Sequence, residues 1–224
     1  MKTLTFYFDF ISPYAYLAWT QIHPLAERYG WEVDPKPVLF AALLDANGQK
    51  GPAEIPRKRS YTFKDVTRSA HRLGVPLAAP ASHPFNPLLA LRVASSDRTS
   101  GERRAVIDAL FAATWVKSLD VSASDQVEAL LGEAGFDGRG LVAWAASPEA
   151  KDRVRQATAE ALEVGAFGVP TIVAQGELFW GLDSFANLEL FLNGKGPPVG
   201  PLAASWNQVT ASASRPAADR QKGR

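Results

Sequence analysis

The chain has 224 residues, of which 46% are hydrophobic and 21% charged, a composition that excludes a collagen-like or wholly disordered protein. Its 24 basic and 23 acidic residues leave a formal net charge of +1, so no strong field favours binding to nucleic acid or an anionic membrane. Cysteine is absent, which excludes a disulfide scaffold, a cysteine nucleophile, a thiolate zinc site and any dithiol redox activity of the chain's own.

The N-terminal segment predicts a βαβ unit. Residues 3–10 (TLTFYFDF) are rich in aromatic and β-branched side chains, as a buried strand requires. Ser12 is a favourable N-cap and Pro13 a favourable first helical residue, so a helix is expected over 13–29. A second strand is expected over 31–40.

A helical block follows this unit. A loop is expected over 45–56, and Ser122 with Asp125 resembles a capping box in which aspartate replaces glutamate. Periodic apolar positions and breakers predict helices over 60–73, 87–96, 103–117, from Ser122 onward, 137–145 and 148–165.

Strand character returns near the C-terminus. Two short strands are expected at 170–174 and 177–180, followed by a helix over 183–193. The tail from residue 203 is rich in alanine, serine and charge, and we expect it to be frayed. The pattern therefore reads βαβ, helical block, ββα, which is an α/β fold class.

Several function classes find no support in the sequence. The histidines His23, His71 and His83 show no metal-ligand spacing, so we expect no metal and interpret them as surface or packing residues. No run of about 18 apolar residues is available to cross a bilayer, and Asp9 interrupts the apolar stretch that an export signal would need. We expect a cytoplasmic protein that binds neither membrane nor nucleic acid.

Ser12 is the strongest candidate for chemistry. On periodicity alone it is a helix cap, like Ser147 before Pro148. A functional role needs a second anchor, and residues 167–171 (FGVPT) offer one. The cis form is found in only about 5–6% of X-Pro bonds, so the sequence alone leaves Pro170 trans.

Four segments carry a resemblance to a known family. Residues 8–17 (FDFISPYAYL), 51–58 (GPAEIPRK), 167–171 (FGVPT) and 180–183 (WGLD) resemble the 2-hydroxychromene-2-carboxylate isomerase family and its kin, the kappa-class glutathione transferases. The likeness covers residues 3–200 in the same order. It implies a thioredoxin-like fold, a cis Pro170 and a homodimer.

The resemblance also implies a division of the chain. The thioredoxin-like domain would be discontinuous, formed by 1–44 and 166–202. Residues 45–165 would form a loop and an all-helical insertion domain, and 203–224 a flexible tail.

The resemblance further implies that glutathione supplies the missing thiol. Residues 12–15 (SPYA) stand where disulfide oxidoreductases of this fold carry C-x-x-C, so both sulfurs are gone. A helix N-terminus can lower a thiol pKa from about 8.5 by a unit or more. Ser12 is therefore expected to stabilise the glutathione thiolate by a hydrogen bond, because no basic neighbour activates it as a nucleophile.

Other family contacts map onto this chain residue by residue. Val169 corresponds to the residue whose backbone pairs with the cysteinyl unit of glutathione, and Gln49 and Pro56 to loop contacts. Asp183, with Leu182 beside it, corresponds to the contact with the γ-glutamyl end, where a carboxylate meets an ammonium group. Asp183 is alternatively the N-cap of the last helix, and both readings can hold together.

The acceptor substrate has weaker signals. Arg57 and Lys58 begin a basic cluster that also holds Arg59, Lys64 and Arg68. This cluster is either a solvated helix face or a site for a substrate carboxylate, which an arginine fork suits. Aromatic side chains near it either line a ring pocket or belong to the core; they are Tyr14, Tyr16, Tyr61 and Phe63.

These expectations predict a glutathione-dependent isomerase that interconverts 2-hydroxychromene-2-carboxylate, a small aromatic carboxylate, and trans-o-hydroxybenzylidenepyruvate. One alternative is a kappa-like transferase or peroxidase that uses the same thiolate on other electrophiles. Another is a non-catalytic carrier of glutathione or an aromatic acid.

Overall fold

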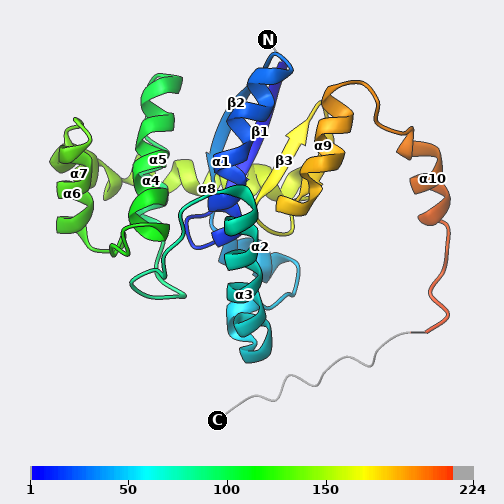
Figure 1. Cartoon of the computed structure of the whole chain (residues 1–224), viewed down its shortest axis with the longest axis horizontal. Coiled ribbons are helices and arrows are strands. Elements are labelled where there is room, and N and C mark those ends of the chain that lie inside the picture. The colour runs from blue at the N-terminus through cyan, green and yellow to red at the C-terminus, as the bar shows by residue number, and fades with distance from the viewer. Residues whose placement is uncertain (1, 214–224) are drawn as a thin grey trace.

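A mixed sheet lies at the centre of the computed structural model, which describes residues 2–213 (Figure 1). Its strands are β1 (Lys2–Phe8), β2 (Trp31–Pro37), β3 (Thr171–Ala174) and β4 (Glu177–Trp180). They lie in the order β2-β1-β3-β4; β1 is parallel to β2 and antiparallel to β3, and β3 is antiparallel to β4. The predicted βαβ and ββα units thus share one sheet.

The helices confirm the predicted order of elements. They are α1 (Pro13–Arg28), α2 (Phe40–Ala46), α3 (Pro56–Leu73), α4 (Leu88–Ala94), α5 (Ser100–Trp115), α6 (Ser124–Glu133), α7 (Gly138–Ala145), α8 (Pro148–Glu163), α9 (Phe185–Leu192) and α10 (Val199–Trp206). Short 3₁₀ turns span Pro52–Glu54 and Leu182–Ser184.

The structure differs from the predictions in three local details. Helix α2 and the first 3₁₀ turn were not expected, because α2 is stabilised from a distance: the Phe40 N–H donates to the side chain of Asp9. Helix α6 is capped at Ala123, since the Ser122 hydroxyl bonds Asp120 at 2.6 Å instead of closing a capping box. Helix α10 extends into the predicted tail as far as Trp206; residues 214–224 of that tail lie outside the described part of the chain.

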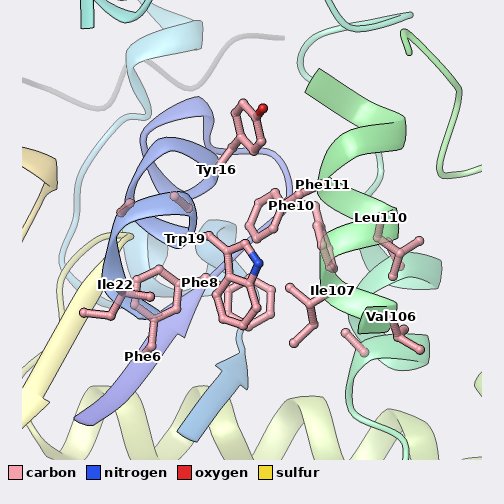
Figure 2. Packing of buried hydrophobic residues seen from close by; sticks show 14 of the residues in the cluster. Phe6, Phe8, Phe10, Tyr16, Trp19, Ile22, Val106, Ile107, Leu110 and Phe111 are labelled. Carbon is pink, nitrogen blue, oxygen red and sulfur yellow. The ribbon is translucent and has the colours of Figure 1, made fainter. Parts of the chain in front are cut away.

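One core joins the sheet to the helical block. Phe6 and Phe8 of β1 lie on the same face and stack at 5.8 Å between ring centroids. Trp19 of α1 packs on both rings, and Phe111 of α5 lies 5.5 Å from Phe8 (Figure 2). Buried residues of the sheet, of α1 and of the helical block thus form one continuous hydrophobic cluster.

The other face of the sheet is covered by α8. Tyr7 points opposite to Phe6 and Phe8, as strand alternation requires, and packs with Ala157 and Ala161. In Figure 1, α8 crosses the sheet on this side. Within residues 2–213, no helix has the length and hydropathy that a membrane span needs.

The strand register brings the two candidate anchors to one end of the sheet. Tyr7 of β1 is paired with Thr171 of β3. Because the two strands are antiparallel, the end of β1 that leads to Ser12 lies beside the start of β3, which Val169 and Pro170 precede.

Candidate active site

Ser12 caps α1, as predicted. Its backbone is extended, with φ −92° and ψ 114°, and its Oγ accepts a hydrogen bond from the Ala15 N–H at 3.2 Å. Within residues 2–213 the hydroxyl donates to no acceptor, so its proton is available to a ligand. The residue is 7% exposed, so access to this hydroxyl is narrow.

The second anchor has the geometry that the family resemblance implies. The Val169–Pro170 peptide is cis. The Pro170 carbonyl accepts a hydrogen bond from the Gly181 N–H at 2.9 Å, and the Thr171 hydroxyl donates to the Gly168 carbonyl at 2.7 Å. The first of these bonds holds the 180–183 segment beside the cis proline.

Tyr14 connects this end of α1 to α3. Its hydroxyl donates to Asp65 Oδ2 at 2.7 Å. Burial, then the bond to Asp65, raise the pKa of Tyr14 above its usual value, and the charge of Asp183 adds to this rise. Asp183 therefore lies within electrostatic reach of the start of α1. It is not the N-cap of α9, since Ser184 occupies that position and makes no side-chain capping bond.

Four predicted site residues are not joined to Ser12. Pro56, Arg57 and Lys58 lie at the exposed start of α3, and Gln49 is exposed in the loop after α2. Within residues 2–213 the side chains of Gln49, Arg57 and Lys58 form no hydrogen bond or ion pair. Their roles in binding glutathione or substrate stay predictions.

Asp9 is a buried residue close to Ser12 that was not among the predicted site residues. Its carboxylate is fully buried and accepts the Ile11 N–H on Oδ1 at 3.0 Å and the Phe40 N–H on Oδ2 at 2.9 Å. Burial raises the pKa of Asp9 to about 7, although the two N–H bonds lower it in part. The available signal was an aspartate inside an otherwise apolar strand run.

A cavity of about 600 Å³ lies next to the Ser12 turn. It is formed by one face of α3, residues 75–83 and Trp115, and we call it the α3 cavity. Ser12 does not line it. Two lining side chains contact the backbone just before Ser12: Trp115 Nε1 donates to the Phe10 carbonyl at 2.9 Å, and His83 Nε2 lies 3.0 Å from the Ile11 carbonyl.

His83 is half-buried between rings, as expected for a packing residue, but it also supports the Ser12 turn. Burial lowers the pKa of His83, so the imidazole is neutral near pH 7. Because the Ile11 carbonyl can only accept, the proton is on Nε2. Nδ1 is buried and has no partner within residues 2–213.

The sequence and the fold are similar to those of known proteins. The family described as a DSBA-like thioredoxin domain matches residues 3–193. The 2-hydroxychromene-2-carboxylate isomerase of Sphingobium xenophagum is 30% identical over 193 residues, which is 85% of this chain and 98% of that protein. Human glutathione S-transferase kappa 1 is 24% identical over 92% of this chain and 96% of its own length.

A solved structure extends the likeness to three dimensions. The structure of a 2-hydroxychromene-2-carboxylate isomerase is similar to this chain with a TM-score of 0.79 at 25% identity, covering 93% of this chain and all of that one. The similarity thus includes the helical block as well as the sheet.

Proposed function

The chain belongs to the DSBA-like thioredoxin family and, within it, to the 2-hydroxychromene-2-carboxylate isomerase family, and we propose that it catalyses this isomerisation with glutathione as cofactor. It is an enzyme of an isomerase family. The substrate, the glutathione dependence, the site residues and a homodimeric state are parts of the proposal.

One observation carries the proposal. The hydroxyl of Ser12 lies at the N-terminus of a 16-residue helix and keeps its proton free of any acceptor within residues 2–213. A glutathione sulfur placed there accepts that proton in a hydrogen bond and meets the positive end of the helix dipole. Both interactions favour the thiolate, which the cysteine-free chain cannot supply itself.

The thiolate then acts as a reversible nucleophile. The ring-opened form of the chromene carboxylate is a conjugated enone. A sulfur–carbon bond forms at its β-carbon while the π pair moves onto the carbonyl oxygen as an enolate. The former double bond rotates as a single bond. The enolate pair returns, the double bond re-forms in the trans geometry, and the thiolate leaves unchanged.

The neighbours of Ser12 fit a tripeptide. The Val169 backbone precedes the cis Pro170 at the same end of the sheet, where an extended cysteinyl unit can pair with it. Leu182 and Asp183 follow Gly181, which is bonded to Pro170. The exposed carboxylate of Asp183 suits the γ-glutamyl ammonium group.

We test the proposal by measuring the thiolate directly. The ultraviolet absorbance of the protein–glutathione complex, titrated with pH, should give a thiol pKa at least a unit below the free value of about 8.5. Conversion of 2-hydroxychromene-2-carboxylate should require glutathione. An unshifted thiol pKa, or a rate that is the same without the tripeptide, contradicts the mechanism.

Replacing Asp183 by asparagine should weaken glutathione binding. The lost interaction is an exposed ion pair of up to about 1 kcal/mol, so we expect a roughly fivefold higher Kd. The measurement is calorimetry with S-methylglutathione and with its analogue that lacks the γ-glutamyl amino group. Asp183→Asn should affect only the first ligand; equal effects on both would place the ammonium elsewhere.

The kappa-class likeness favours a second candidate function. The human kappa transferase covers 92% of this chain, and the proposed thiolate could equally attack other electrophiles or a hydroperoxide. Net consumption of glutathione distinguishes the two functions, because the isomerase returns the tripeptide and a transferase or peroxidase does not.

A further inference from the structure

We infer that the α3 cavity binds the carboxylate-bearing aromatic substrate, with Arg59 as the group that selects the carboxylate. This inference rests on the proposed function and names its second binding site. The carboxylate would then be bound by a different residue of the basic cluster from Arg57 or Lys58.

The cavity has the size and lining of a pocket for a small aromatic molecule. Its volume of about 600 Å³ lies within the roughly 300–1,000 Å³ of small-molecule sites. Phe63 and Trp115 supply ring surfaces, and Val66, Val75 and Leu77 supply aliphatic ones. A planar, largely apolar ligand fits this surface.

The charge of the cavity favours an anion. None of the described residues that line it is an aspartate or glutamate. Arg59 contributes a guanidinium that lies over Phe63, at 5.5 Å from the ring centroid. It donates one bond within residues 2–213, from Nη2 to the His83 carbonyl at 3.2 Å, so most of its five N–H donors remain for a ligand.

The cavity adjoins the Ser12 turn through its own wall. His83 and Trp115 each contact a backbone carbonyl in the two residues that precede Ser12. A ligand packed against these rings therefore lies next to the segment that places the Ser12 hydroxyl.

The wall opposite α3 is fixed before any ligand binds. The Ala78 N–H donates to the Trp115 carbonyl at 2.7 Å, and the Ser118 hydroxyl donates to the Ala79 carbonyl at 2.6 Å. These bonds tie the 75–83 segment to the end of α5. A preformed pocket loses less free energy on binding than one that must be ordered.

The test measures binding without glutathione. Calorimetry with trans-cinnamate should detect binding to the wild-type chain, and Arg59→Gln should raise its Kd about tenfold, as expected for loss of a charge-assisted pair. Cinnamyl alcohol, which has the same ring but no charge, should bind both proteins equally. Thr67→Phe, which fills the cavity from α3, should weaken both ligands.

The matched control is Arg68→Gln. Arg68 is exposed on the same helix, does not line the cavity and forms no bond within residues 2–213, so its loss should leave both affinities unchanged. An unchanged cinnamate Kd in Arg59→Gln, or no binding to the wild type, overturns the inference. If cinnamate binding responds as expected while glutathione shows no thiolate shift, the cavity assignment holds and the proposed isomerase mechanism fails.

Discussion

Replacing Ser12 by alanine should raise the pKa of bound glutathione and lower turnover by up to about tenfold. The hydroxyl acts on the fraction of glutathione that is thiolate, and this fraction changes by at most about tenfold for each pKa unit. The helix dipole remains in the variant, so the thiol pKa should stay below that of free glutathione but rise by about a unit. Absorbance titration of the complex and kcat for chromene carboxylate measure the two effects.

The chain offers a matched control in Ser147. Ser147 also precedes a proline and caps a 16-residue helix, with Oγ accepting the Ala150 N–H at 3.1 Å, against 3.2 Å for Ser12 and Ala15. Both alanine variants should lose about 1 kcal/mol of unfolding free energy. Only the Ser12 variant should lose turnover. Equal activity in the two variants would make Ser12 a cap and nothing more.

The same experiment separates an enzyme from a carrier. A carrier has no turnover to lose, and its affinity for glutathione would barely change in the Ser12 variant, because the tripeptide makes most of its contacts elsewhere.

The sequence predicts the elements that local chemistry determines. The cap at Ser12, the cap at Ser147 and the short β3–β4 hairpin each depend on a few neighbouring residues, and all are present in the structure. Helix α2 was missed because its first N–H is accepted by Asp9, which lies 31 residues earlier in the chain. The helix propensities of residues 40–46 contain no information about a hydrogen-bond partner so far away in the chain.

The candidate site likewise has parts that contiguous motifs predict and parts that only the fold brings together. Motif resemblance predicted the segments around Ser12, Val169 and Asp183, because each is contiguous in sequence. The α3 cavity was not predicted, because its walls come from three separate segments, and His83 contacts Ile11 across 72 positions of the chain. Only the packing of α3 and the end of α5 around α1 brings these side chains together.

Replacing Asp9 by asparagine should remove a large pH dependence of stability. Burial raises the pKa of Asp9 from 3.8 to about 7, so the folded state holds this proton more tightly than the unfolded state. The stability contribution is fully present below about pH 4 and is lost as the pH rises through 7. At about 1.4 kcal/mol per pKa unit, the loss is about 4 kcal/mol.

The difference in unfolding free energy between wild type and Asp9→Asn isolates the titration of Asp9. His23 and His83 have lowered pKa values, so their contribution to stability is lost as the pH falls. Both proteins contain these histidines, and their effect therefore cancels in the difference. Urea unfolding from pH 4 to 8.5 should show the wild type losing its advantage over Asp9→Asn as the pH rises. Asp45→Asn, the same change on an exposed residue, should track the wild type throughout.

The substitution also changes the hydrogen bonds that the side chain of residue 9 accepts. Asparagine has one acceptor oxygen, whereas the hydroxyl oxygen of a protonated carboxyl can still accept, so only in the variant does the Ile11 or the Phe40 N–H face a group that cannot accept. The variant should therefore be less stable than the wild type at low pH by about 1–3 kcal/mol. A pH-independent difference in stability between the two proteins would mean that Asp9 titrates alike in the folded and unfolded states.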